Sequence, residues 1–247
     1  MDVGVPRPDY ERFVELARTE LDPRFSWQDY RTERGYPFIF GKLMRNGTVV
    51  RDRQTQHLAM RQCVGIDIFP LDGIPRRRLG RAAHKWAAKF CRLRLGAGIP
   101  SGWPKKGLAL ASHLVPRRFA IWLCERMGRH VAYEKSAIVA NLGGAYGYAR
   151  ESVPREWFGD GAELPFEDMT ACGPAEWDAY LKHVYGDYMQ LPPEDKRRTD
   201  HDLTEVAIGP SFPSPTAGEG NAGASRRCES SAPAPARVLS SRRDTYF

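Results

Sequence analysis

Acidic residues are absent from a long central part of this sequence. No Asp or Glu occurs between Gly73 and Cys124, although the chain of 247 residues contains 30 acidic side chains against 37 Lys and Arg. Such a segment attracts phosphates, nucleic acid or an anionic membrane surface. Its basic residues are Arg76, Arg77, Arg78, Arg81, Lys85, Lys89, Arg92, Arg94, Lys105, Lys106, Arg117 and Arg118.

Long apolar runs and paired cysteines are missing as well. No run approaches the ~20 apolar residues of a membrane span, and no secretory signal pattern opens the chain, so a cytoplasmic protein is expected. The five cysteines include no Cys-x-x-Cys pair. This pattern favours reduced thiols over a disulfide framework or a zinc site.

A short strand carrying a carboxylate is predicted over residues 65–73. Ile66 and Ile68 alternate with Asp67 and Phe69, and a turn is expected from Pro70 to the Asp-Gly pair that follows. A charge between β-branched neighbours is costly unless a cation or a donor meets it. Asp67 is therefore predicted to be either a metal ligand or a paired structural acid.

The N-terminus repeats this arrangement and then predicts a helix. Asp2 also stands between apolar neighbours, and apolar residues at three- and four-residue steps predict a helix over 8–21. Arg7 would then lie at the helix start, beside the carboxylates. A phosphate contact and a solvated or salt-bridged arginine both suit this position.

Segments 36–43 and 48–51 flank Asn46 and Gly47, and this Asn-Gly pair predicts a β-hairpin. Lys42 lies on the first predicted strand, where the pattern alone favours a solvent-facing side chain. Residues 141–147 lack the lysine and hydroxyl of a phosphate-binding loop and are predicted to form a turn between strands. A further helix is predicted from Pro174, closed by Gly186.

Two helices are predicted within the basic segment. Leu79, Ala83, Trp86, Phe90 and Leu93 form an apolar stripe on an otherwise basic helix. This helix is either a membrane-surface segment or a core helix with an Arg-rich polar face. A second helix, which contains the 119–122 segment, is expected to pack beside it. Beyond about residue 209, Ser, Pro, Ala, Gly and Arg dominate, and a disordered tail is predicted.

Two motifs resemble those of the LicD family of phosphotransferases. One runs from Asp2 through Pro6 and Arg7 to Tyr10, and the other is Ile66-Asp67-Ile68-Phe69-Pro70-Leu71-Asp72-Gly73. The resemblance continues at residues 41–43, 151–158 and 180–193, and it covers most of the chain up to about residue 202.

The resemblance implies an α+β nucleotidyltransferase-like fold with a small mixed sheet flanked by helices. One transferase domain would span residues 1–208, with a helical basic insertion at about 76–132 and a disordered tail at 209–247. The implied reaction moves phosphocholine, or a related alcohol phosphate, from a CDP-linked donor such as CDP-choline to a sugar hydroxyl of a surface glycan. It would require Mg²⁺ or another divalent cation.

The same resemblance implies roles for particular residues. Asp2 and Asp67 would be the catalytic metal ligands, Arg7 and Lys42 would neutralise phosphate oxygens, and Asp72 would support the turn after the strand. Family members usually carry another Asp two residues ahead of the position of Asp2. That position precedes Met1, so we expect a fragment or a wrongly started reading frame, with weakened metal binding and activity.

Two other functions stay open at this level. The chain could be a non-catalytic remnant that binds a glycan or a partner, and an upstream in-frame start encoding an Asp-rich run would favour the enzyme instead. It could also bind nucleic acid through the basic segment, although no nucleic acid motif accompanies that segment and nucleic acid is not the expected partner. A peripheral contact with an anionic membrane is a further expectation.

Overall fold

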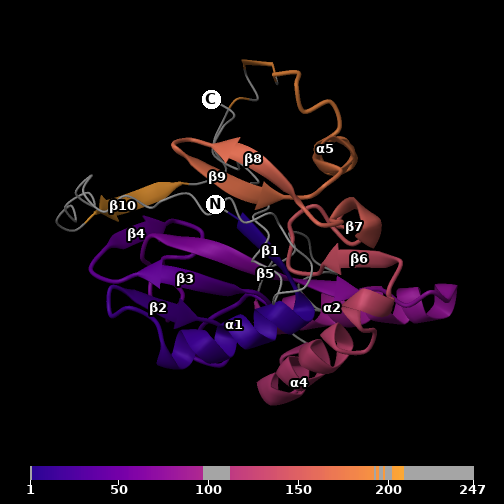
Figure 1. The fold of residues 1–247 in the computed structure, drawn as a ribbon. Coiled ribbons are helices and arrows are strands. Elements are labelled where there is room, and N and C mark those ends of the chain that lie inside the picture. Colours follow the sequence, from indigo (N-terminus) through magenta and orange to yellow (C-terminus); the bar gives the residue numbers. More distant parts are fainter. Residues whose placement is uncertain (1, 97–111, 192, 195–196, 198–201, 209–247) are drawn as a thin grey trace.

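The computed structural model describes residues 2–96, 112–191, 193–194, 197 and 202–208 (Figure 1). These residues form a mixed α+β fold, as the resemblance implies, with helices packed on a central sheet. The predicted tail at 209–247 and Cys228 lie outside the described residues.

The central sheet has six strands, and its longest strand, β5, runs through the middle. Asp67 of β5 pairs with Asp2 on one side and with Lys42 on the other, so β1 lies along one edge of β5 and β3 along the opposite edge. β1 is parallel to β5, and the other pairings are antiparallel. The strands are β1 (Asp2–Pro6), β2 (Phe25–Gln28), β3 (Gly41–Arg45), β5 (Gly65–Gly73), β6 (Ile138–Asn141) and β7 (Ser152–Pro154).

The predicted turn inside residues 65–73 is wrong, because β5 continues without interruption to Gly73. Its second half pairs with β6, where Asp72 lies opposite Ala140 and Gly73 opposite Val139. Pro70 removes one backbone donor but does not end the strand, because burial and pairing on both sides outweigh the signal of the Asp-Gly pair.

Helix α1 (Arg7–Thr19) covers one face of this sheet, close to the predicted 8–21. Tyr10, Val14 and Ala17 pack against the side chains of Val3, Val5 and Ile68, together with Trp27. Helix α1 therefore lies on the face to which the even-numbered positions of β5 point, and Asp67 points to the other face.

The predicted helices of the basic segment are α2 (Arg78–Leu95) and α4 (Arg117–Gly128), and they pack side by side as expected. For Leu79 and Trp86 the alternative of a core helix is wrong, because both side chains are exposed. The buried side of α2 differs from the predicted stripe and carries His84, Ala88, Cys91 and Leu95. The buried residues of α4 include Ala120, Cys124 and Met127. Small residues dominate this contact because they allow the two helices to approach closely.

The predicted hairpin around Asn46 and Gly47 is also wrong in its pairing. The chain does turn at Gly47, whose φ is 78°. However, β4 (Val49–Asp52) pairs with β10 (Leu203–Ala207), whereas β3 pairs with β2 and β5. The observed strand β3 also starts later than the predicted one, because residues 36–40 form a loop of mostly buried side chains.

The remaining elements lie on the face of the sheet opposite α1, where Figure 1 shows the β8 and β9 hairpin and α5. The segment between β6 and β7 is a turn, as predicted. The predicted helix from Pro174 begins at Trp177, and Gly186 ends it with a φ of 77°. These elements are η1 (Tyr133–Lys135), η2 (Arg155–Trp157), β8 (Ala162–Phe166), β9 (Met169–Gly173) and α5 (Trp177–Tyr185).

No helix of the described residues is both long and apolar enough to cross a membrane. Cys63, Cys91, Cys124 and Cys172 are free thiols, in agreement with the prediction for these four residues.

Candidate functional site

Asp2 and Asp67 are directly paired residues of the parallel strands β1 and β5. Neighbouring strands lie about 4.8 Å apart, and paired residues project their side chains from the same face of a sheet. The structure therefore brings together the two acids that the motifs single out, on the face opposite α1. The sequence separates them widely, and the register of β1 on β5 creates the pair.

Lys42 and Gln28 extend this pair across the sheet. Lys42 of β3 is the partner of Asp67, and Gln28 of β2 is the partner of Lys42. We call Asp2, Asp67, Lys42 and Gln28 the polar row. Lys42 Nζ lies 2.7 Å from Asp67 Oδ1, and the two side chains are 24% and 18% exposed. Lys42 and Asp67, in the middle of the row, are thus partly exposed to solvent and are joined by an ion pair.

Aromatic rings hold Lys42 from the other side. Its Nζ lies 5.4 Å from the ring centroid of Phe38 and 5.7 Å from that of Phe40. The Phe40 ring in turn contacts Phe69 of β5, with 4.2 Å between the centroids. An ammonium group over aromatic faces is stabilised by the ring quadrupoles. Sequence reasoning did not assign Phe38 and Phe40 to the site, although both alternate with Ile39 just ahead of Lys42.

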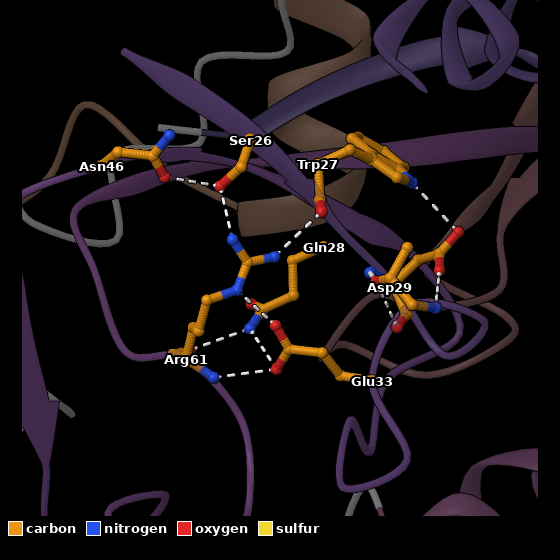
Figure 2. Close-up of polar contacts among 8 residues, drawn as sticks. Ser26, Trp27, Gln28, Asp29, Glu33, Asn46 and Arg61 are labelled. Atoms are coloured by element: carbon orange, nitrogen blue, oxygen red, sulfur yellow. Dashed lines mark hydrogen bonds and ion pairs between the residues drawn. The ribbon is translucent and has the colours of Figure 1, made fainter. Parts of the chain in front are cut away.

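Gln28 is fixed by the network in Figure 2. Its Nε2 donates to Glu33 Oε2 at 2.9 Å and to the backbone oxygen of Arg61 at 2.8 Å. Arg61 bonds through Nε to Glu33 Oε1 at 2.5 Å and donates through Nη1 to Ser26 Oγ at 2.7 Å. The network ties the loops after β2 and before β5 to β2 itself. It therefore fixes the base of the loop that carries Phe38 and Phe40.

Arg7 and Asp72 do not join the polar row. Arg7 Nε donates to Asp72 Oδ1 at 2.6 Å, and Nη2 donates to Oδ2 at 2.8 Å, with both side chains buried. Burial opposes the charge on Arg7, but the adjacent Asp72 carboxylate raises the pKa of this guanidinium. Burial raises the pKa of Asp72, and Arg7 offsets part of that effect.

The location of this pair bears on two expectations. Asp72 lies within β5 and points to the α1 face, so it does not support a turn beside the carboxylates. Arg7 is the salt-bridged arginine of the two interpretations, because its guanidinium is engaged by Asp72. A contact of Arg7 with a phosphate stays a prediction. Arg7 and Asp72 connect the start of α1 to the C-terminal end of β5, on the face opposite the polar row.

Tyr180 of α5 lies near the Asp2 end of the polar row. The sequence pattern predicted only a core position for this ring. Burial raises the pKa of Tyr180, and the negative charges of Glu151 and Asp2 raise it further. The ring packs beside Phe158, with 5.9 Å between the centroids. The effect of Asp2 on Tyr180 places one residue of the last segment of resemblance near the polar row.

The polar row can offer a divalent ion two carboxylates. Within the described part of the chain, no group of three or more His, Cys, Asp or Glu residues could hold a metal. Carboxylate oxygens suit Mg²⁺, which usually keeps several waters and binds proteins through one or two carboxylates together with substrate phosphates. Asp2 and Asp67 fit this pattern, whereas the ion pair of Asp67 with Lys42 also fits the alternative of a structural acid.

Comparison with known proteins gives one informative match. The chain is 21% identical over 216 residues to the lipopolysaccharide cholinephosphotransferase LicD of Haemophilus influenzae. The aligned region covers 81% of this chain and 77% of that protein. No protein-family model matches the chain, and no solved structure matches it. The chain is thus similar over most of its length to a LicD cholinephosphotransferase, and the resemblance to the LicD family that its motifs indicate is confirmed.

Proposed function

We propose that this protein transfers phosphocholine, or a related alcohol phosphate, from a CDP-linked donor to a sugar hydroxyl of a glycan. The observation that carries the proposal is the direct pairing of Asp2 with Asp67, because it joins the two segments that match the LicD motifs into one site. The likeness to a cholinephosphotransferase over most of both chains supports the reaction class and a lipopolysaccharide or similar glycan as the acceptor.

The reaction is a displacement at phosphorus. The acceptor hydroxyl oxygen attacks the phosphorus that bears the choline, and a new phosphorus–oxygen bond forms to the sugar. The bond from that phosphorus to the bridging oxygen of the diphosphate breaks, and CMP leaves with its electron pair. The hydroxyl proton passes to a base or to solvent. Such reactions depend mainly on alignment and on stabilisation of charge around the phosphoryl oxygens.

Asp2 and Asp67 would hold Mg²⁺ in this scheme. A bound divalent cation supplies charge neutralisation for the diphosphate and orients the reacting groups. Lys42 would provide a second positive charge, since its ammonium lies 2.7 Å from Asp67 and is held by aromatic rings. Arg7 and Asp72 are left out of the phosphate contacts because they bind each other on the opposite face.

A nucleotidyltransferase-like core is part of the proposal. The mixed sheet, with the parallel pair β1 and β5 at its carboxylate-bearing centre, supports it. We also propose that residues 1–208 act as one transferase unit. The expected weakness of the metal site stays a prediction, because it depends on a position ahead of Met1.

Transfer assays with CDP-choline test the proposed function. The protein is incubated with CDP-choline, Mg²⁺ and deacylated lipopolysaccharide, and CMP release and phosphocholine incorporation are both measured. We expect Mg²⁺-dependent CMP release that is lost in Asp67→Asn. Asp22→Asn is the matched control, because this exposed acid lies in the loop between α1 and β2 and pairs with the nearby Arg24.

The outcome separates the enzyme from a non-catalytic remnant. CMP release in the parent and in Asp22→Asn, but not in Asp67→Asn, supports the transferase. Equal CMP release in the parent and in Asp67→Asn would show that the assigned carboxylate has no role. Absence of release in the parent under all divalent cations, also in a form extended by the upstream reading frame, would favour the remnant.

A further inference from the structure

Helix α2 presents large apolar side chains to solvent. Leu79 is 86% exposed and Trp86 is 60% exposed. The two residues lie about two turns apart, so they share one side of the helix. The opposite side is buried, because His84, Ala88 and Cys91 face the core. Leu79 and Trp86 are therefore not core residues of this fold.

Basic side chains flank this apolar side. Arg78, Lys85 and Lys89 are exposed on α2, and Lys89 Nζ lies 4.8 Å from the centroid of the Trp86 ring. Among the residues that the structure describes, no acidic side chain forms an ion pair with Arg76, Arg77, Arg78 or Lys85. We define Arg78, Leu79, Lys85, Trp86 and Lys89 as the α2 face.

Helix α4, which packs beside α2, has a similar exposed composition. Phe119 is 45% exposed and Trp122 is 55% exposed, with 5.6 Å between their ring centroids. Arg118 and Arg126 are exposed on the same helix. Two neighbouring helices thus combine exposed aromatic residues with basic ones, in a segment where the sequence from Gly73 to Cys124 has no acid.

We propose that the α2 face docks on an anionic phospholipid surface. A helix lying in the membrane interface buries Trp and Leu side chains at the boundary of headgroups and acyl chains, while Lys and Arg approach the lipid phosphates. The α2 face supplies both kinds of group, and the missing acids remove the repulsion that an anionic surface would meet.

A lipid surface explains this face better than a nucleic acid does. Arg and Lys would contact the phosphates of either partner, and Trp86 could stack on a base. Leu79 is the most informative residue, because an almost fully exposed leucine offers a nucleic acid neither a stacking surface nor a hydrogen bond, whereas a bilayer accepts it.

This inference goes beyond the proposed transfer reaction and does not depend on it. The residues of the α2 face are separate from the polar row, so loss of docking and loss of chemistry can be measured independently.

Vesicle co-sedimentation tests the proposal with the full chain. Vesicles of phosphatidylglycerol and phosphatidylcholine in equal amounts are compared with vesicles of phosphatidylcholine alone. We expect binding to the anionic vesicles that weakens as salt is raised, and at least about tenfold weaker binding to the neutral ones. Equal binding to both vesicle types, or no binding to the anionic ones, would overturn the proposal.

Variants assign the binding to the α2 face. Lys85→Glu combined with Lys89→Glu, and separately Leu79→Ser combined with Trp86→Ala, should each weaken binding to anionic vesicles at least about tenfold. Lys135→Glu and Leu16→Ser are the matched controls, because both residues are exposed on other elements and should leave binding unchanged. Circular dichroism and thermal melting verify that each variant is folded.

Two results would contradict the assignment. Undiminished vesicle binding by both folded α2 variants would place the lipid contact elsewhere. Salt-dependent retention of DNA or RNA that both α2 variants lose, without vesicle binding by the parent, would identify a nucleic acid as the partner instead.

Discussion

Arg7 and Asp72 form a buried, two-point ion pair that joins the first residue of α1 to the C-terminal end of β5. The two bonds measure 2.6 Å and 2.8 Å. A Cβ on Gly128 of α4 would lie 2.6 Å from Arg7 Nη2, so the guanidinium is also enclosed by the helical layer. The pair holds α1, β5 and α4 in one arrangement, beneath the face that carries the polar row.

Removing one partner of this pair should destabilise the fold strongly. In Asp72→Asn, the buried Arg7 keeps its charge and loses its counterion, which costs about 3–5 kcal/mol in comparable buried pairs. Urea unfolding followed by circular dichroism measures this change. The double variant Arg7→Met, Asp72→Asn should be more stable than Asp72→Asn alone, because no unpaired buried charge remains.

The exposed pair of Arg24 with Asp22 is the control for that measurement. Its atoms approach to 2.8 Å, but both side chains lie in solvent. Asp22→Asn should leave the unfolding midpoint unchanged. If Asp72→Asn also left it unchanged, Arg7 and Asp72 would not organise the layers as described.

Gly41→Ala should destabilise the sheet next to the polar row. A Cβ at Gly41 would lie 2.0 Å from Cζ2 of Trp27. That ring is buried and is held by Tyr10 and Phe13, with centroid distances of 6.0 Å and 5.6 Å, so it has little room to move. Overpacking of this kind costs about 1–3 kcal/mol.

A double-variant comparison tests the stated cause. Thermal melting should show that Gly41→Ala causes a much smaller loss of stability when Trp27→Leu is already present, because the smaller leucine side chain leaves space for the added Cβ. An equal cost in both backgrounds would mean that the collision with Trp27 is not the reason.

His84 should make the fold less stable in mildly acidic solution. Burial lowers the pKa of His84, an effect that the nearby Asp72 opposes only in part. The unfolded chain therefore binds a proton near pH 6.5 that the folded protein does not, and stability falls as the pH falls below about 6.5. In His84→Leu, the melting temperature should change less between pH 7.5 and 5.5 than in the parent.

His57→Gln is the control for that comparison, because His57 is exposed on a loop. Its melting temperature should follow the pH dependence of the parent. If the melting temperature of His84→Leu depended on pH as strongly as that of the parent, His84 would not be the cause of the pH dependence.

Lys42→Met should separate a substrate contact from a structural ion pair. If Lys42 neutralises a donor phosphate, transfer from CDP-choline should fall at least about tenfold, with a higher KM for the donor, and Lys42→Arg should retain part of the activity. Loss of this partly exposed ion pair alone changes stability by about 1 kcal/mol or less. Unchanged kinetics in Lys42→Met would leave Lys42 as a partner of Asp67 only.

Local patterns in the sequence predict α1 and the strand at Ile66 to Ile68, because hydrophobic periodicity decides such elements. The family resemblance is what suggested that Asp2 and Asp67 meet, and the parallel register then places them side by side. The pairing of Arg7 with Asp72 was not foreseen, because the turn predicted from Pro70 removed Asp72 from the strand. Only an uninterrupted β5 places Asp67 and Asp72 on opposite faces.

The buried side of α2 could not be read from hydrophobicity. Leu79 and Trp86 formed the expected apolar stripe, but the contact with α4 uses small residues such as Ala88 and Cys91. Close helix packing selects small side chains, whereas the alternative of a core helix placed the large side chains of the stripe in the core. The pairing of β4 with β10 was missed for a related reason, since its two partners are far apart in the sequence and share no local signal.

Binding of Mn²⁺, a spectroscopic substitute for Mg²⁺, measures whether Asp2 and Asp67 form a metal site. Electron paramagnetic resonance titrations compare the parent with Asp2→Asn, Asp67→Asn and the control Asp22→Asn. We expect one Mn²⁺ site that weakens at least about tenfold in both Asp2→Asn and Asp67→Asn, with unchanged melting temperatures and no effect of Asp22→Asn. Equal Mn²⁺ affinity in all four proteins would contradict the assignment of Asp2 and Asp67 as a metal site.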